Sequence, residues 1–350
     1  MKVNYKNTTL VIVICSVLIT QACKKIKPLK NDIDYPAAYI INGESNTISV
    51  IDIITDEVKG TATFKKGTWP HHIYANSDKS KVVVSLTGMD LSGGHSGGHG
   101  GGHGKSNKTY IMTLNAKTLA LDKSLKTDVG AHNAIFVNTD TEIWLPQIKT
   151  DGTIKILEAS TLKEKSNISV GNTPLEITLS NDKKYAFVAN NAANSISVID
   201  ISSKKLVKTI MVGKEPVGAW PGSNNKMYVD CEASKQIFEI DAISLIITDT
   251  ISLLFTPAYA AYNSKTKQLW ISDAEFGRVH IYNNTSGNWI ESSFIITGNN
   301  AHAIAFNKEE TKAYITNQGA ASVSVIDAIT LSKTKDIAVG NKPNGILIIE

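Results

Sequence analysis

The sequence repeats with a period of about 42 residues, and no other feature limits its fold so strongly. Glycines that begin a Gly-x-x-Pro corner, or a close variant of it, mark this period: Gly171 and Gly213 lie 42 residues apart, as do Gly298 and Gly340. Between the corners run short segments rich in Val, Ile, Tyr, Phe and Thr, separated by turn-forming residues. From Ala37 onward no helical period is sustained. Seven corners, each followed by about four strands, predict an all-β, seven-bladed propeller of antiparallel blades.

The fourth repeat shows how one blade is built. Its predicted strands are Pro174–Ser180, Tyr185–Asn190, Ser195–Asp200 and Leu206–Val212. They are almost continuous apolar runs, as expected for sheets that are covered by neighbouring blades on both faces.

The two ends of the chain are predicted to close the ring. The last corner, Gly340 to Pro343, is followed by a single strand, Gly345–Ile349. The first folded residues supply the other strands of a blade but lack an innermost one. We therefore expect Tyr39–Asn42 to pair with the C-terminal strand, which leaves no open sheet edge.

A Tyr-x-x-Asn…Ser-Val-x-Val-Ile-Asp…Val-Gly-x-x-Pro pattern is clearest around Tyr185–Asn190, Tyr314–Asn317 and Tyr39–Asn42. This pattern resembles the YVTN-repeat family of seven-bladed propellers, and the resemblance covers residues 37–350. It implies the fold more firmly than a function, since such propellers serve as binding modules, surface proteins and occasional enzymes. Some similar propeller lipoproteins capture vitamin B12. Seven-bladed lactonases also resemble the family and rely on a cluster of His, Glu and Arg.

The N-terminus resembles a lipoprotein signal. Lys2 and Lys6 precede an apolar core, Leu10–Ile19, which is too short to span a bilayer. Ala22 and Cys23 follow and resemble a lipobox, so we predict a signal peptide over residues 1–22, acylation (palmitate included) of Cys23, and a polar tether over 23–36. A plain secretory signal is the alternative.

This interpretation predicts a location in the envelope of a Gram-negative bacterium. Lys24 is not the aspartate associated with inner-membrane retention, which favours the outer membrane and leaves its two faces open. The membrane, reached through Cys23, is then one partner. With Cys23 acylated, Cys231 is the only free thiol of the mature chain, and we expect it to be buried.

The charge pattern argues against nucleic-acid binding. The formal net charge is +4, and Arg278 is the only arginine among 36 basic residues. Arginine supplies the planar fork that reads bases and phosphates, so its near absence excludes nucleic acid as an expected partner.

Histidine gathers at one end of the predicted ring. Gly67 and Gly130 are 63 residues apart, which is 42 plus a 21-residue Gly/His-rich insertion at about 87–107. Antiparallel counting places this insertion on the same side as the corners. Seven of the eight histidines map there, four after corners and three in the insertion: His71, His72, His132, His302, His95, His99 and His103.

Imidazoles that converge in this way predict a metal site, and zinc or copper is the metal they favour. Glu176 occupies the matching position in the fourth repeat and adds a carboxylate. Two structural alternatives stand beside this prediction. The histidines after the corners could bond to backbone or water at a wet channel mouth, and the insertion could be a disordered tip that binds metal adventitiously.

We therefore expect a non-catalytic, lipid-anchored propeller that binds a metal or a metal-bearing cofactor at the corner-side mouth of its central channel. A structural or protein-interaction platform in the envelope, with an envelope protein as partner, is the alternative. A propeller hydrolase such as a lactonase ranks third, because Arg278 lies in a third strand, away from the mouth. We expect a monomer.

Overall fold

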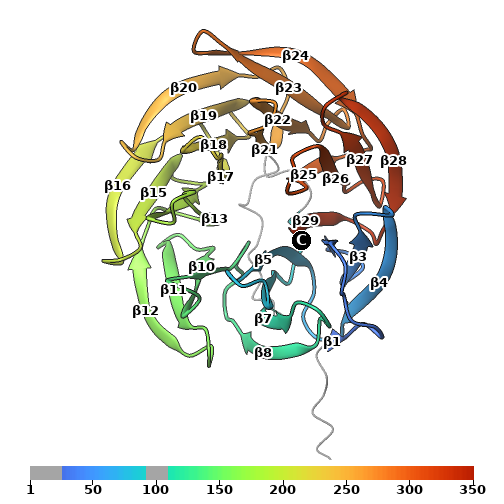
Figure 1. Ribbon diagram of the computed structural model, residues 1–350. Coiled ribbons are helices and arrows are strands. Elements are labelled where there is room, and N and C mark those ends of the chain that lie inside the picture. The colour runs from blue at the N-terminus through green and yellow to red at the C-terminus, as the bar shows by residue number, and fades with distance from the viewer. Residues whose placement is uncertain (1–25, 92–108) are drawn as a thin grey trace, which may run out of the picture.

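The computed structural model describes residues 26–91 and 109–350, and these residues form strands but no helices. The strands make seven antiparallel sheets arranged in a ring (Figure 1), which confirms the predicted seven-bladed propeller. In the described part of the chain, no helix is long and apolar enough to cross a membrane.

The strands of each blade are stacked from the axis of the ring outward. In this order, blade 1 contains β29 (Pro343–Ile349), β2 (Ala37–Asn42), β3 (Thr47–Asp52) and β4 (Glu57–Phe64), with the short β1 (Ile26–Lys27) outside β4. Blade 2 contains β5 (Pro70–Ala75), β6 (Lys81–Leu86), β7 (Tyr110–Asn115) and β8 (Leu121–Lys126). Blade 3 contains β9 (Ile135–Val137), β10 (Glu142–Gln147), β11 (Thr153–Glu158) and β12 (Glu164–Ser169). Blade 4 contains β13 (Pro174–Leu179), β14 (Tyr185–Asn190), β15 (Ser195–Asp200) and β16 (Lys205–Met211).

The other three blades follow the same plan. Blade 5 contains β17 (Pro216–Pro221), β18 (Lys226–Cys231), β19 (Gln236–Asp241) and β20 (Ile246–Ser252). Blade 6 contains β21 (Pro257–Asn263), β22 (Gln268–Asp273), β23 (Arg278–Thr285) and β24 (Asn288–Ile296). Blade 7 contains β25 (Ala301–Phe306), β26 (Lys312–Asn317), β27 (Ser322–Asp327) and β28 (Ser332–Ala338).

The ring is closed by its own termini, as predicted. β2 pairs with the C-terminal β29 in antiparallel register, with Tyr39 opposite Leu347 and Ala37 opposite Ile349. Blade 1 is therefore assembled from both ends of the chain, and β2 is paired on both sides, with β3 and with β29.

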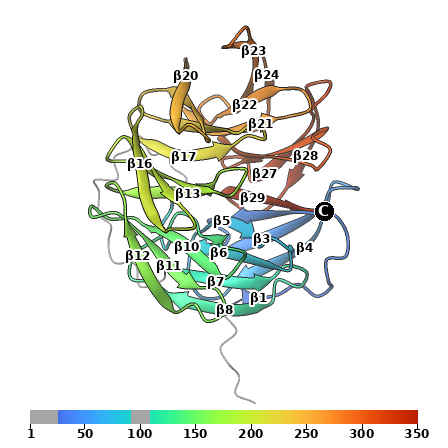
Figure 2. The same ribbon diagram turned by 60° about the vertical axis from the view of Figure 1, so that its left-hand side comes forward.

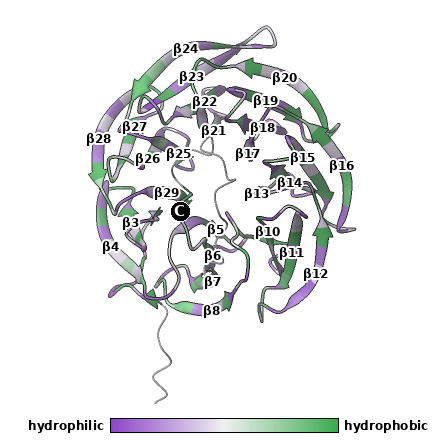
Figure 3. Ribbon diagram, turned by 180° about the vertical axis from the view of Figure 1, so that it is seen from behind, coloured by the Kyte–Doolittle hydropathy of each residue, from purple (hydrophilic) through white to green (hydrophobic). Residues whose placement is uncertain are grey.

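Apolar side chains fill the spaces between neighbouring blades. Phe187 and Val198 of blade 4, for example, share one buried cluster with Met227 and Val229 of blade 5. Full burial of such a side chain contributes about 1.5–3 kcal/mol to stability. The outermost strands are more polar, and Figure 3 shows hydrophilic stretches on β12 and β28.

A hydrogen-bonded pair recurs in three blades, where the amide of a second-strand Asn donates to the hydroxyl of a third-strand Ser. The donor and acceptor are 2.9 Å apart each time, in Asn42–Ser49, Asn190–Ser197 and Asn317–Ser324. We call this pair the Asn–Ser clamp. Its recurrence around the ring identifies it as scaffold.

We call the end of the ring at which the corners enter the innermost strands the corner face. The hairpins between the second and third strands lie at the same end, since Pro174 at the start of β13 pairs with Asn190 at the end of β14. β6 ends and β7 begins at this face, where Leu86 pairs with Tyr110, so the described ends that flank the Gly/His-rich insertion lie where the antiparallel counting predicted. Its histidines, His95, His99 and His103, lie outside the described residues.

The segment assigned by sequence to a tether contacts the propeller from Ile26 onward. β1 pairs with β4, and the side chains of Ile26 and Ile33 are buried against blade 1. The predicted signal peptide and Cys23 lie outside the described residues, so their assignment stays a prediction.

Candidate metal centre

A bulge after each corner proline aims side chains into the corner face. β5 and β13 both begin with such a proline and both shift register directly after it. In β5 the bulge holds His71 and His72, and in β13 it holds Leu175 and Glu176. A bulge of this kind bends the strand and redirects its side chains. Two residues per strand end are thereby presented at the corner face.

Three histidines and one carboxylate converge there. His71, His72, His132 and Glu176 each offer a ligand atom, and these atoms all lie within 4.8 Å of one another. We call this set the His3Glu cluster. Its members come from β5, from the loop before β9 and from β13, so three blades contribute to one site. All four side chains are buried.

Glu176 connects two of the three histidines. Its Oε1 lies 2.8 Å from Nε2 of His72 and also within hydrogen-bond distance of Nδ1 of His132. An ionised carboxylate only accepts hydrogen bonds, so these two nitrogens carry the hydrogens. When these rings are neutral, Nδ1 of His72 and Nε2 of His132 then hold the lone pairs.

His71 is the least satisfied member of the cluster. It is 1% exposed, and neither ring nitrogen has a hydrogen-bond partner within the described residues. The other carboxylate oxygen of Glu176, Oε2, is buried and unpartnered in the same sense. Each buried polar group that lacks a partner costs about 1–3 kcal/mol. Burial, reinforced by the nearby His132 and His72, holds the pKa of His71 well below its usual value. The ring is therefore neutral, which is the form that binds metals.

The backbone around the cluster is fixed by close contacts. Asn133 donates to the carbonyl of Ile177 at 2.8 Å and accepts from its N–H at 3.1 Å. The carbonyl of His132 accepts a hydrogen bond of 2.7 Å from Ser85. Gly345 of β29 packs so closely that a Cβ atom there would lie 2.7 Å from the carbonyl oxygen of His71. Only glycine fits that contact.

His302 lies beside the cluster. It is half-buried at the start of β25, and its ring centroid is 6.5 Å from that of His72. Of the four predicted mouth histidines, three therefore converge and the fourth flanks them. His280, which the sequence analysis set apart, lies in the third strand of blade 6.

The described start of the insertion covers the corner face next to the cluster. Leu91 and Met89 pack on Leu175, which precedes Glu176, together with Ile148 and Val217. This apolar contact joins blades 2 to 5 and includes Leu175, the sequence neighbour of Glu176.

The insertion is also held from the other side. Asp90 pairs with Lys342 of the last corner at 2.6 Å. Thr87 and Gly88 donate backbone hydrogen bonds to Trp69 and Thr68.

Two tyrosines lie close to Glu176. Burial, with the negative charge of Glu176 as the next cause, raises the pKa of Tyr74 and of Tyr259. Both phenols are therefore neutral donors at physiological pH. Tyr259 stacks on Trp220 with ring centroids 3.9 Å apart, and the indole N–H of Trp220 donates to Asp230 at 2.7 Å.

Asp230 is a second buried carboxyl group near this site. The sequence did not indicate this residue. It is fully buried, and burial together with the charge of Glu232 raises its pKa to about 8. Asp230 is thus mostly a neutral carboxylic acid at pH 7.

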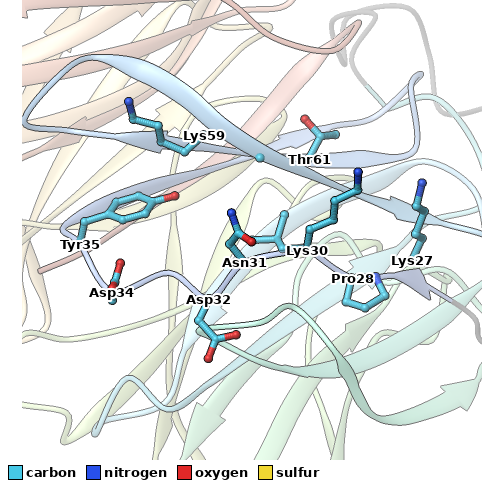
Figure 4. Close-up of a pocket in the computed structure, with 11 residues that line it drawn as sticks. Lys27, Pro28, Lys30, Asn31, Asp32, Asp34, Tyr35, Lys59 and Thr61 are labelled. Carbon is cyan, nitrogen blue, oxygen red and sulfur yellow. The ribbon is translucent and has the colours of Figure 1, made fainter.

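Two surface depressions lie apart from the cluster. One has a volume of 790 Å³ on the outside of blade 1 and is lined by Lys27, Lys30, Lys59, Asp32 and Asp34, among others (Figure 4). The other measures 780 Å³ and is formed by the far ends of the innermost strands and their hairpins in blades 1 to 4. Neither includes a member of the His3Glu cluster.

Comparison with known proteins supports the fold. A family model described as a YNCE-like beta-propeller matches residues 101–226. Among curated proteins, none matches this sequence. A putative 6-phosphogluconolactonase from Bacteroides fragilis has a similar structure, with a TM-score of 0.71 and 14% identity, over 91% of this chain and 99% of that one.

Two further solved structures cover nearly the whole chain. The periplasmic gluconolactonase PpgL of Pseudomonas aeruginosa has a TM-score of 0.71 and 12% identity, over 90% of this chain and 99% of its own. Apo AztD from Citrobacter koseri has a TM-score of 0.58 and 13% identity, over 92% and 98%. Identities this low show a common fold and no more.

These names correct one expectation. The sequence led us to expect a chain that is not an enzyme, and that expectation is contradicted by proteins of the same fold that are named as lactonases. A lone arginine away from the mouth, which argued against catalysis, does not exclude a site built from other residues. The chain is a seven-bladed β-propeller, similar over residues 101–226 to the YNCE-like propellers.

Proposed function

We propose that the chain binds one divalent transition-metal ion, zinc or copper, in the His3Glu cluster. The observation that carries this proposal is a set of four buried ligand atoms within 4.8 Å of one another. Both ring nitrogens of His71 and one oxygen of Glu176 lack hydrogen-bond partners in the described structure. Buried polar atoms without partners are rare in folded proteins, and a bound ion would satisfy one nitrogen of His71 together with the oxygen of Glu176.

The donor set favours zinc and copper over harder ions. Three imidazoles with one carboxylate can complete a four-coordinate shell around Zn²⁺, and imidazole also suits copper. Calcium and magnesium prefer shells of oxygen atoms, which this cluster does not supply.

Metal binding at this cluster would compete with the hydrogen bonds that Glu176 accepts. The hydrogens on His72 and His132 occupy the side of each ring that faces Oε1. Coordination by those atoms would therefore require each neutral ring to move its hydrogen to the other nitrogen.

The test is titration of the chain from Lys24 onward, which keeps every described residue, with Zn²⁺ and with Cu²⁺ by calorimetry. We expect one tight site per chain, which a double His71→Ala, His132→Ala variant loses. His280→Ala is the matched control, because it removes a buried histidine outside the cluster and should leave binding unchanged. Equal binding by the double variant and the wild type would overturn the proposal.

A second variant distinguishes metal binding by the cluster from metal binding by the insertion. Replacing residues 92–108 with a short Gly/Ser linker removes His95, His99 and His103 but keeps Leu91. A site in the cluster survives this change with its stoichiometry unaltered. Loss of all binding in the linker variant would assign the metal to the insertion instead.

A second function, hydrolysis of a sugar lactone, is supported by the similar structures named as a gluconolactonase and a putative 6-phosphogluconolactonase. A bound zinc ion would polarise water and the lactone carbonyl. Water would then attack the carbonyl carbon and the ring C–O bond would break, giving the hydroxy acid. Glu176 would take the proton of the attacking water and return it to the ring oxygen.

Glu176→Gln tests this second function. If the three histidines hold the metal and Glu176 moves the proton, the variant keeps zinc but loses hydrolysis of gluconolactone above the spontaneous rate. A wild-type rate no faster than that of the double histidine variant would exclude the activity.

We also propose that the protein is anchored in the outer membrane through acylated Cys23. The support is the sequence alone: the apolar core Leu10–Ile19 and the Ala22-Cys23 pair. Labelled palmitate should enter the wild-type chain and not a Cys23→Ser variant, and that variant should be released from membranes.

A further inference from the structure

Blade 6 departs from the repeat at the hairpin between β22 and β23. In blades 1, 4 and 7 the clamp Asn faces a small polar residue across this hairpin, Thr47, Ser195 or Ser322. In blade 6 the equivalent pair is Asp273 and Arg278. The hairpin tip carries Glu275 and Phe276. Nothing in the scaffold role of the hairpin requires these larger, charged and aromatic residues.

The adjoining outer strand departs from the repeat as well. The residue opposite the clamp position is polar in four other blades, namely Thr61, Thr209, Thr250 and Asp336. In blade 6 this position, opposite His280, is Phe294. Ile296 lies opposite Arg278 on the same pair of strands.

These substitutions leave large apolar side chains in water. Leu254 is 98% exposed, Ile296 64%, Phe276 58% and Phe294 47%. Leu254 belongs to the same surface, because its neighbour Phe255 stacks on His280, which pairs with Phe294. Other exposed isoleucines, Ile54, Ile243 and Ile329, recur at equivalent turn positions and are part of the repeat. Ile296 has an equally exposed counterpart in blade 4, Met211, but the positions of Phe276 and Phe294 are not aromatic in blades 1, 4 and 7.

Arg278 lies at the centre of this surface. Its guanidinium carbon is 4.6 Å from the ring centroid of Phe294 and 5.4 Å from that of Phe276. No carboxylate of the described residues is within ion-pair distance of Arg278, and Glu275 has no ion pair there either. Glu275 and Arg278 are three residues apart and carry opposite charges, but neither forms an ion pair within the described residues. Phe276 lies between them in the sequence.

We propose that this surface, made of Leu254, Glu275, Phe276, Arg278, Phe294 and Ile296, binds the same surface of a second copy of the chain. This proposal replaces the monomer expected from the sequence. A two-fold axis through the hairpin would bring Arg278 onto Glu275 of the partner subunit, and the reciprocal pair would form with it. The apolar side chains would be covered around these pairs.

The composition of the surface supports self-association. A two-fold interface must be self-complementary, and one hairpin that carries both an unpaired cation and an unpaired anion meets that requirement. Aromatic residues and arginine are enriched at the centres of protein interfaces. Apolar residues scattered singly over a surface, by contrast, do not indicate an interface. β23 and β24, the strands that carry Arg278, Phe294 and Ile296, lie at the opposite end of the molecule from β1 (Figure 2).

Sedimentation equilibrium of the chain from Lys24 onward tests the proposal. We expect a monomer–dimer equilibrium at micromolar concentrations. The charge reversals Arg278→Glu and Glu275→Arg should each raise the dimer dissociation constant at least about tenfold, because each places like charges together. The double reversal should restore most of the wild-type affinity. Circular dichroism and thermal melting of each variant check that it is folded.

Two results would overturn the proposal. A wild-type chain that stays monomeric throughout the range would show that another molecule, or none, covers the surface. If neither single charge reversal changes the dimer dissociation constant, the interface lies elsewhere. Phe276→Ser serves as a further variant and should weaken the dimer without introducing like charges.

Discussion

The carboxamide of Asn133 forms two hydrogen bonds with the backbone of Ile177, although the two residues are 44 positions apart in sequence. Asn133 follows His132, and Ile177 follows Glu176. This pair of bonds therefore fixes the distance between a histidine of blade 3 and the carboxylate of blade 4. Both side-chain atoms of the amide are used, so the relative orientation of the two strands is set as well.

Asn133→Ala removes both bonds without touching a metal ligand. Two buried backbone groups of Ile177 lose their partners, so the free energy of unfolding should fall by about 1–3 kcal/mol. Zinc affinity should fall at least about tenfold, because His132 and Glu176 are no longer held in register. Urea unfolding and zinc titration measure the two effects. Asn167→Ala, an exposed amide on β12, is the control, and equal zinc affinity in both variants would contradict the positioning role.

Gly345 is a second support of the site, from the C-terminal strand. Gly345→Ala would place a Cβ atom 2.7 Å from the carbonyl oxygen of His71 and 2.9 Å from Cα of His72. The two strands must separate, which costs about 1–3 kcal/mol and shifts both histidines. Thermal unfolding should show the loss, and zinc titration should show weaker binding.

Gly60→Ala is the matched control for that variant. Its added Cβ meets only the flexible side chain of Leu29, far from the cluster. A smaller loss of stability and unchanged zinc binding are expected. If Gly345→Ala binds zinc as tightly as Gly60→Ala, contact with β29 does not position the histidines.

The fold was predictable because the period is a property of the chain itself. Equal spacing of the corners gives the number of blades, and the missing innermost strand at the N-terminus gives the closure by β29. The observed strands of blade 4 agree with the predicted ones to within one residue. Propeller blades pack on their neighbours in sequence, so local pattern and tertiary structure are closely linked.

The site was predictable only in part, because it is made where repeats meet. Antiparallel counting placed His71, His72 and His132 at one end, and Glu176 was noted there as a carboxylate. Which of them touch depends on the bulges after the corners, and a bulge has no clear sequence signal. Counting also grouped His302 with the others, whereas the structure puts its ring 6.5 Å from that of His72.

Leu91 should control how fast the metal leaves. It packs against Leu175, the residue before Glu176, and we expect it to cover the cluster. Leu91→Ser weakens this apolar contact and admits water, so a chelator should extract zinc at least about tenfold faster while the equilibrium affinity changes less. Stopped-flow release with a chromogenic chelator measures the rate. Ile54→Ser, on an exposed turn, should release zinc at the wild-type rate, and matching rates in the two variants would show that Leu91 does not cover the site.

In blade 6 the Asn–Ser clamp is replaced by an ionic one. His280 takes the place of the serine, with Nε2 at 3.3 Å from Asp273 and Nδ1 at 2.8 Å from Glu291. Phe255 stacks on the ring at 4.0 Å. Burial lowers the pKa of His280, but the hydrogen bonds to Asp273 and Glu291 outweigh it, so the pKa is raised above the usual 6.5. Arg278 and Tyr282 are the other ionisable groups on the same strand near this ionic clamp.

The ionic clamp should make stability depend on pH. A folded-state pKa above the unfolded value means that the contribution of His280 is fully present below about pH 6.5 and is lost as the pH rises through the folded pKa. A double Asp273→Asn, His280→Ser variant restores the neutral clamp of the other blades and should lose this dependence. Urea unfolding of both proteins from pH 6 to pH 9 gives the difference between their free energies of unfolding. The remaining histidines are the same in both proteins, so their contribution drops out of this difference. The wild type should lose stability relative to the variant as the pH rises, and a constant difference would show that His280 is not charged in the folded state.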